Sequence, residues 1–401
     1  MASTASENES HPIWELIPLA HYQLPSAPTA SSAKRGLSSL KRFFRWRRPA
    51  PQGPVKREDE LHALAPERLE AVAGPIDWRA AARVLQTALE QRAPTERVWF
   101  IIGPPTAGYA ELLETWAEQH DRVCIPAPAP EVVTGNHSGW LADWPQDGCL
   151  WALPRLERCW LRHPAGLDLI RGLFERLLSA RQGFGLIGCD SWTWAYLRFV
   201  VPTPAVRALT LQALDGERLA RWLASLAAGH DQRPRRFRHA QSGNRVLTVN
   251  GGEEMGESAA NNELRYLAAQ ARGNPGVALQ RWRSRLRSEP DKPEAADEES
   301  DDQPDVETIW VAPALEFALP SGWGEPEALI LHALLLHDGL PTEILAALLP
   351  APRARTRDLL WQLAASDVIS ADPEGIWRVT PSAYPAVRSF LAERDFLTDA
   401  C

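Results

Sequence analysis

Short apolar runs alternate with amphipathic segments between about residues 76 and 215. Nearly all-apolar strands placed between helices are typical of a parallel sheet that is covered on both faces. The pattern therefore predicts a doubly wound α/β core. Its strands are expected at residues 97–103, 123–126, 149–153, 183–189 and 206–211, and its helices include residues 77–92 and 167–181.

The rest of the chain has mainly helical spacing, interrupted by one acidic segment. Residues 216–228 and 262–286 have the apolar periodicity of helices. Ten acidic residues and one lysine lie between Glu289 and Glu307. Such a composition buries too little apolar surface to fold, so it indicates a linker.

The C-terminal part combines three helical segments with a hairpin. The hairpin is expected at residues 367–380 and a last helix near 383–394. Three helices followed by a short hairpin are the pattern of a winged helix, which is the fold predicted here. The three preceding helical segments lie near residues 325–337, 341–349 and 353–366.

Composition limits the classes of function. The net charge is −8 over 401 residues, which argues against a surface made throughout for nucleic acid and leaves only local contacts with polyanions. No stretch of about 18 uncharged apolar residues and no signal-peptide pattern is present, so a cytoplasmic protein is expected. The five cysteines form no C-x-x-C pair, so they suggest neither a disulfide framework nor a zinc site. They are Cys124, Cys149, Cys159, Cys189 and Cys401.

The N-terminal region carries a basic cluster. Nine Lys or Arg and no acidic residue occur between Lys34 and Arg57, in a stretch rich in Ser, Pro and Ala. The apolar and basic residues of this stretch suit an anionic membrane surface at the inner face of a membrane, nucleic acid or an acidic partner. A solvated arm with no partner is the alternative. The candidate contact residues are Lys41, Arg42, Phe43, Phe44, Arg45, Trp46, Arg47 and Arg48.

The chain enters a glycine-containing turn after its first core strand. Gly103 and Gly108 have the spacing of G-x-x-x-x-G-K-[ST], the loop that holds the phosphates of a nucleotide. Tyr109 replaces the lysine, and Ala110 replaces the hydroxyl residue that ligates Mg²⁺. The amides around Thr106 and Gly108 at the helix start would still favour an anion, so weak ATP or ADP binding is one reading. The other is that the glycines only form a tight turn.

The following strands supply few groups for metal chemistry. Pro154 and Arg155 occupy the positions where a metal-binding acid pair is expected, and Glu157 comes two or three positions late. Glu157 is expected to cap the next segment or to pair with an arginine. Asp190 and Ser191 end the next strand, where a polar residue would sense the γ-phosphate.

Residues 77–286 resemble the AAA+ and STAND groups of P-loop ATPases. The resemblance is carried by I-I-G-P-P-T-A-G-Y-A, L-W-A-L-P-R-L-E-R, L-I-G-C-D-S-W and A-R-G-N-P-G-V-A-L. It implies a helical lid over the nucleotide, with Arg272 or Arg281 as a phosphate contact or as a solvent-facing helix charge. The resulting domain division is an arm at 1–75 that is mostly disordered, a P-loop NTPase-type core at 76–215, a helical lid at 216–288, a linker at 289–307 and a winged-helix-like domain at 308–401.

The C-terminal domain gives a mixed charge signal. Arg353, Arg355 and Arg357 begin its third helix and suit phosphates, whereas Asp358, Asp372 and Glu374 suit a protein partner. Two histidines in its first helix, His332 and His337, are expected to pack rather than to bind metal.

The function predicted from these features is that of a degenerate AAA+-like module with no catalytic or metal-binding residue. It is expected to act without hydrolysis as a regulatory or scaffolding partner of another protein. Two alternatives stay open at this point. One is an active ATPase that a partner subunit completes, and the other is a winged-helix regulator that binds DNA.

Overall fold

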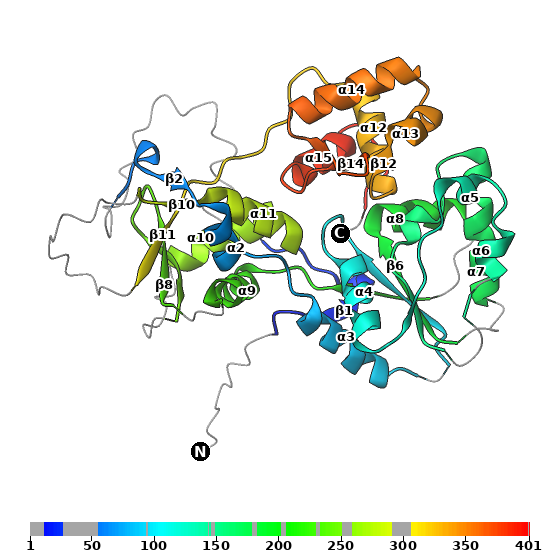
Figure 1. Ribbon diagram of the computed structural model, residues 1–401, viewed down its shortest axis with the longest axis horizontal. Helices are drawn as coiled ribbons and strands as arrows, with labels where there is room; N and C mark the ends of the chain where they lie inside the picture. The colour runs from blue at the N-terminus through cyan, green and yellow to red at the C-terminus, as the bar shows by residue number, and fades with distance from the viewer. Residues whose placement is uncertain are drawn as a thin grey trace.

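The computed structural model describes most of the chain. Its helices and strands form three sheets with their covering helices (Figure 1). The described residues are 12–26, 55–93, 95–142, 144–145, 149–178, 183–201, 206–229, 233–250, 259–290, 306–399 and 401.

The first sheet has six strands in the order β1-β7-β3-β6-β5-β4. The five strands from β7 to β4 are parallel, and β1 pairs antiparallel with β7 at one edge. The sequence therefore predicted the parallel core correctly, and the fold is of the mixed α/β class. The strands are β1 (Leu16–Pro18), β3 (Val98–Gly103), β4 (Val123–Cys124), β5 (Trp151–Leu153), β6 (Gly185–Asp190) and β7 (Arg207–Leu211).

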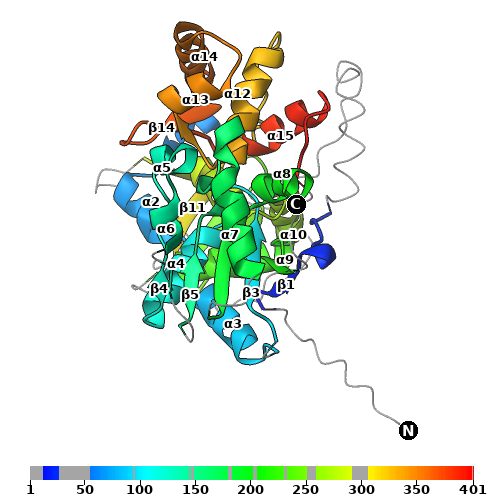
Figure 2. The same cartoon turned by 90° about the vertical axis from the view of Figure 1, so that its right-hand side faces the viewer.

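Helices cover both faces of this sheet because its central strands are apolar on both sides. Phe100 of β3 contacts Phe174 of α7 and Trp194 of α8 on one face. On the other face, Leu113 of α4 lies close to Gly188 of β6. Figure 2 shows α7 in front of the strands and the C-terminal elements above them. The helices of this part are α3 (Arg79–Glu90), α4 (Tyr109–Gln119), α5 (Pro130–Thr134), α6 (Ser138–Ala142), α7 (Asp168–Leu178) and α8 (Ser191–Val200), with short 3₁₀ turns η3 (Leu156–Arg158) and η4 (Pro164–Gly166).

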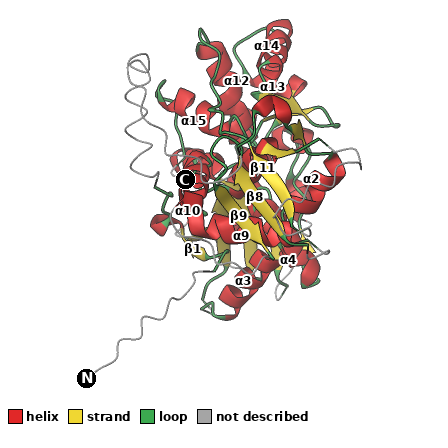
Figure 3. Ribbon diagram, turned by 90° about the vertical axis from the view of Figure 1, so that its left-hand side faces the viewer, coloured by secondary structure: helices red, strands yellow, loops and turns green. Residues whose placement is uncertain are grey.

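A second sheet lies where the sequence predicted a purely helical lid. Five strands in the order β2-β10-β11-β8-β9 pack against α9, α10 and α11 (Figure 3). The strand that follows the predicted linker, β11, pairs in parallel with β8 and so belongs to this sheet rather than to the C-terminal domain. The elements are β2 (His62–Ala63), β8 (Arg235–His239), β9 (Arg245–Val249), β10 (Leu286–Ser288), β11 (Glu307–Val311), α2 (Pro66–Val72), α9 (Gly216–Ala228), α10 (Ala259–Gln270) and α11 (Pro275–Arg285).

The pattern of β8 explains why this sheet was not predicted. Phe237 is buried against Trp282 of α11, but the neighbouring inward position is Arg235, which is also buried. Arg235 is neutralised there by Glu307, 3.0 Å away, and donates to the carbonyl of Ala227. An arginine at an inward position hides the alternation on which a strand prediction depends.

Parts of the predicted N-terminal arm are ordered. Strand β1 and the 3₁₀ turn η1 (Leu19–His21) extend the first sheet, and Trp14 packs against Trp78 and Trp222. Residues 55–75 contain η2 (Glu58–Glu60), β2 and α2. The predicted disorder is therefore wrong for these two stretches, because their aromatic and apolar residues find partners far away in the chain.

The C-terminal unit, residues 325–392, contains four helices around a three-stranded sheet of order β12-β14-β13. Its helices form where the sequence predicted helices. Among the described residues of the whole chain, no helix has the length and apolar character needed to cross a membrane. The elements are α12 (Glu325–Leu336), β12 (Leu340–Pro341), α13 (Thr342–Leu348), α14 (Arg353–Ala365), β13 (Ile369–Ala371), β14 (Ile376–Val379) and α15 (Tyr384–Ala392).

Candidate functional site

The turn between β3 and α4, residues 103–108, lies at the carboxyl edge of the parallel sheet. Gly108 precedes the first residue of α4 and has a φ of 79°, in the left-handed region that glycine tolerates. The indole ring of Trp78 lies directly against it, since a Cβ added to Gly108 would meet that ring at 1.8 Å. Thr106 also has a positive φ, 65°, and its side chain is exposed. The turn is therefore a constrained structure that an aromatic ring covers.

Tyr109 and Ala110 lie in the core rather than in an open cleft. Tyr109 is 6% exposed, and its ring packs against Gly103, whose added Cβ would be 3.1 Å from the tyrosine Cδ1. Ala110 is 1% exposed. The two positions at which a phosphate-binding loop presents lysine and hydroxyl groups are thus used for packing.

The segment Gly273–Asn274–Pro275 closes the turn from the other side. The Asn274 side chain caps α11 by accepting from the amides of Gly276 and Val277, and its amide nitrogen donates to the Pro105 carbonyl at 2.7 Å. Gly276 approaches so closely that an added Cβ would lie 2.3 Å from the Thr106 carbonyl oxygen. This segment therefore contacts the turn directly.

The space left between these elements is small. A cavity of about 20 Å³ lies among Gly103, Tyr109, Ala213, Asn274 and their neighbours. Such a volume holds about one water molecule, whereas sites for small molecules have volumes of roughly 300–1,000 Å³. As it stands, the cavity has no room for a triphosphate.

Two buried carboxyl groups lie beneath the turn. Asp190 is the partner of Gly103 in the register of β6 and β3, and its Oδ1 accepts from the Trp192 amide at the start of α8. The Oε2 of Glu157 accepts from the Asp190 amide at 3.2 Å. Neither residue is exposed to solvent, and one oxygen of each carboxyl has no hydrogen-bond partner. The expectation that Glu157 caps the next segment is wrong, because its carboxylate accepts from the Asp190 amide at the end of β6. The alternative expectation, an arginine neighbour, agrees with Arg155, whose positive charge acts on this carboxyl.

The environment of these groups favours their protonated forms. Burial raises the pKa of Glu157 to about 8, and the negative charge of Asp338 adds to this effect, whereas Arg155 and the Tyr109 hydroxyl oppose it. Burial and the neighbouring Glu157 raise the pKa of Asp190. Burial also raises the pKa of Tyr109, so the tyrosine stays neutral. A lysine at this position would supply a cation to the pair, and tyrosine does not.

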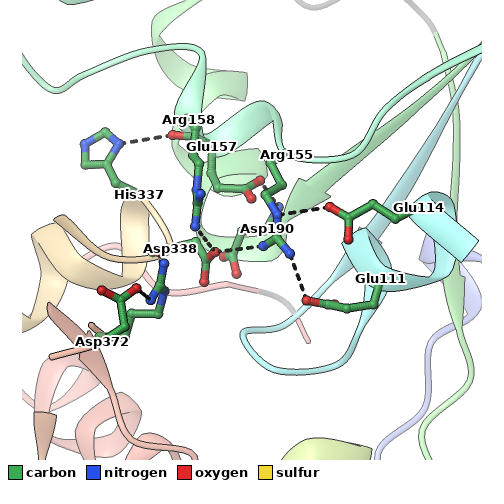
Figure 4. A network of polar contacts seen from close by, with 10 residues as sticks. Glu111, Glu114, Arg155, Glu157, Arg158, Asp190, His337, Asp338 and Asp372 are labelled. Atoms are coloured by element: carbon green, nitrogen blue, oxygen red, sulfur yellow. Dashed lines mark hydrogen bonds and ion pairs between the residues drawn. The ribbon is translucent and has the colours of Figure 1, made fainter. Parts of the chain in front are cut away.

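Arg155 connects this pair to the C-terminal unit (Figure 4). Its guanidinium forms ion pairs with Glu111 at 2.8 Å, Glu114 at 3.4 Å and Asp338 at 3.1 Å. Arg158 pairs with the same Asp338 oxygen at 3.3 Å. Burial disfavours the charge on Arg155, but the surrounding carboxylates outweigh burial and raise its pKa. Asp338, which follows α12, was not found by sequence reasoning because its partners are about 180 residues away.

The two histidines of α12 and its end are buried packing residues, as expected. The Nε2 of His337 accepts from the Arg162 amide, so its Nδ1 donates to the Glu157 carbonyl. Burial lowers the pKa of both His332 and His337 to about 4. Within the described part of the chain, no group of three or more His, Cys, Asp or Glu residues is arranged to hold a metal.

The remaining residues predicted to contact phosphate bind other parts of the chain. Ser191 Oγ donates to Asp399 at 2.6 Å, and Arg272 Nη2 donates to the main-chain oxygen of Cys401 at 2.7 Å. Arg281 donates to the Ser382 carbonyl and to the Gln270 side chain, so it is not a solvent-facing charge. The structure brings the turn and Asp190 together, but it uses the other groups as contacts between units.

The two predicted outer contact regions are separate from this site. Arg353, Arg355 and Arg357 are exposed on α14, which lies at the outer end of the C-terminal unit (Figure 1), and Arg353 pairs with Glu343. Residues 41–48 lie outside the described residues, so their contact with a membrane or polyanion stays a prediction.

Comparison with known proteins gives only distant structural matches. No protein-family model and no curated protein matches the chain. The RuvB Holliday junction branch migration motor of Thermotoga maritima matches over 83% of this chain and 97% of its own, with 16% identity and a TM-score of 0.31. Cdc6p from Pyrobaculum aerophilum matches over 84% of this chain and 100% of its own, with 12% identity and a TM-score of 0.32. Scores this low carry no inference about function.

The closed turn predicts a large effect of a methyl group at Gly108. Gly108→Ala should lower the free energy of unfolding by about 2–4 kcal/mol, because the left-handed φ and the contact with Trp78 both penalise a Cβ. Gly139→Ala is the control, since an added Cβ meets nothing within 4 Å in α6, and it should be neutral or stabilise by up to about 1 kcal/mol. Urea unfolding measures both, and equal effects would contradict the packed turn.

The raised pKa of Glu157 predicts a pH-dependent effect of Glu157→Gln. The unfolded carboxyl ionises near pH 4.5, whereas the folded one keeps its proton until about pH 8. The protonated carboxyl therefore contributes its full stabilisation below about pH 4.5, and this stabilisation is lost as the pH rises through about 8. Between these two pH values, the free energy of unfolding of the variant should rise relative to that of the wild type by up to about 1.4 kcal/mol per pH unit.

Unfolding measured from pH 5 to 8 tests this expectation. Glu393→Gln, at an exposed position, is the control and should follow the wild-type curve. His332 and His337, whose pKa values burial lowers, are common to all three proteins, so their effect on stability cancels in the comparison. Parallel curves for the Glu157→Gln variant and the wild type would contradict the burial of a protonated carboxyl.

Proposed function

We propose that this chain is an AAA+-type module whose nucleotide site is closed by its own side chains. It acts without hydrolysis, as a regulatory or scaffolding partner of another protein. The observation that carries the proposal is the packing of Tyr109 and Trp78 around the turn, with Asn274 bonded to Pro105 across it. A triphosphate could enter only if these contacts broke together.

The chemistry of the surrounding groups supports the absence of hydrolysis. Phosphoryl transfer relies on a cation and a metal ion that neutralise the developing charge. At this turn the nearest groups are two buried carboxyls that favour their protonated forms, and Arg155 is engaged with Glu111, Glu114 and Asp338. Among the residues that the structure describes, these groups leave the turn without a free positive charge where a nucleotide would need it.

Two features of the arrangement agree with the AAA+ resemblance. The glycine turn follows a strand in the middle of the parallel sheet, and the segment Gly273–Asn274–Pro275 lies on that turn. We also propose that α12, α13, α14 and the hairpin of β13 and β14 form a winged helix, because their order and pairing follow that motif.

The exposed side of α14 favours a protein as the partner of this unit. Trp361 is 64% exposed, and Arg357 lies one turn before it on the same side of the helix. Trp and Arg are the residues most enriched at the energetic centres of protein interfaces. Acidic residues on or near this surface, Asp358 and Glu343, weaken its attraction for the phosphates of DNA.

A nucleotide titration tests the closed site. A ligand present at 100 times its Kd would stabilise the native state by about 2.7 kcal/mol. We expect no shift of Tm with millimolar Mg-ATP and no hydrolysis by the wild-type protein. Turnover that Tyr109→Ala or Glu157→Gln abolishes, while Glu393→Gln leaves it unchanged, would overturn the proposal and favour an active ATPase.

A DNA titration separates the protein-binding surface from a DNA-binding one. Fluorescence anisotropy with duplex DNA should show no binding tighter than the roughly 10⁻⁶ M of non-specific contacts at physiological salt. Arg355 and Arg357 make no ion pair with any described residue, so the double variant Arg355→Ala and Arg357→Ala is the natural comparison. Tight, salt-dependent binding that this variant loses would support the DNA-binding alternative.

A further inference from the structure

The last described residues of the chain return to the core instead of extending into solvent. Leu397–Asp399 and Cys401, here called the tail, lie between the C-terminal unit and the start of α8 (Figures 1 and 2). The Leu397 carbonyl accepts from His332 Nε2 at 3.2 Å. The tail therefore contacts both the α/β core, at Ser191, and the C-terminal unit, at His332.

Asp399 is held by a set of side-chain donors. Its side chain is fully buried, and its carboxylate accepts from Ser191 Oγ at 2.6 Å, from the Tyr384 hydroxyl at 3.2 Å and from Arg388 Nε at 2.8 Å. A second nitrogen of Arg388, Nη2, donates to the Asp399 carbonyl at 2.8 Å. Trp192 in turn donates to the Tyr384 hydroxyl and orients it. A guanidinium and two hydroxyls directed at one buried carboxylate form a built recognition site.

Arg272 extends this site along the tail. It donates to the main-chain oxygen of Cys401, which is 3% exposed. The site therefore binds an aspartate side chain and the main chain that follows it. Its residues come from three different parts of the molecule, α8, α15 and the segment that precedes α11.

The tail is attached in a way that permits exchange. Its contacts with the rest of the described chain are made by side-chain donors, and no backbone-to-backbone hydrogen bond holds Leu397–Asp399 or Cys401. Leu397 and Thr398 are only half-buried, and Cys401, which is buried, has a small side chain, so apolar burial adds little. The tail can leave without breaking a helix or a strand, whereas Ser191, Tyr384 and Arg388 stay on their helices.

We propose that Ser191, Tyr384, Arg388 and Arg272 form a binding site for an extended acidic peptide that the tail occupies in cis. An aspartate-bearing segment of a partner competes for the same donors and releases the tail. Release loosens the C-terminal unit from the α/β core. The site adjoins the closed turn through Arg272 and Ser191, but its tests involve no nucleotide, so their outcome is separate from that of the proposed function.

Cys401 reports directly on whether the tail is bound. Alkylation of the native full-length protein, followed by mass spectrometry of each cysteine, gives five rates in one experiment. Cys124 and Cys149 are exposed and mark the fast limit, and buried Cys159 and Cys189 mark an intact core. Asp399→Asn should speed Cys401 alkylation at least about tenfold while Cys159 and Cys189 stay slow. Asp395→Asn, at an exposed position just before the tail, should leave Cys401 slow.

A peptide tests the recognition itself. The peptide Phe-Leu-Thr-Asp-Ala-Ser, which copies residues 396–401 with serine in place of the cysteine, should speed Cys401 alkylation in the wild-type protein. The same peptide with asparagine in place of aspartate should not, and Arg388→Gln should abolish the difference between the two peptides. The proposal is overturned if Cys401 in Asp399→Asn stays as slow as Cys189, if it reacts only together with Cys159 and Cys189, or if both peptides act alike.

Discussion

Glu157 and Asp190 lie side by side at the carboxyl edge of the parallel sheet, buried and without a cation from the turn above them. In a phosphate-binding loop, a lysine at the position of Tyr109 would supply positive charge there. In this protein the negative charge of the two buried carboxyls is reduced in two other ways. The pKa of each carboxyl is raised, so protonation removes charge, and the positive charge of Arg155 acts on Glu157. Arg155 is itself buried enough to need carboxylates, and one of them, Asp338, comes from the C-terminal unit. The charge balance under the turn thus contributes to the association of the two units.

Sequence reasoning found the elements whose signals are local. Apolar runs predicted β3 and β6 closely, and the glycine spacing located the turn, because both depend on neighbouring residues. The register that places Asp190 beside Gly103 follows from parallel pairing of two predicted strands. Counting along the chain did not predict that the Glu157 carboxylate accepts from the Asp190 amide, because that contact joins residues of two different strand ends. The role of Trp78 as a cover on Gly108 had no signal in the sequence, because it depends on how α3 packs.

Contacts between distant segments were beyond such reasoning for a physical reason. A buried arginine such as Arg235, or a partly buried one such as Arg388, is stabilised by a carboxylate, and that partner lies wherever the fold brings one. Glu307 and Asp399 provide these carboxylates, and neither is near its arginine through a local pattern of helix or strand. The sequence therefore suggests that Arg235 lies at the surface, whereas the structure buries it beside Glu307.

The residues expected to contact phosphate explain why the closed form is stable as it stands. In a nucleotide-driven machine, groups at the strand ends and near the lid bind ligand in one state and release it in another, so their contacts must be exchangeable with water or nucleotide. Here Ser191 binds Asp399, Arg272 binds Cys401 and Arg281 binds Ser382, all within one chain. Contacts within one chain do not weaken when the concentration of a ligand falls. A nucleotide can therefore favour a different arrangement of the protein only by displacing these contacts. Under the proposed function, a molecule that competes for these same groups would control the arrangement in place of nucleotide turnover.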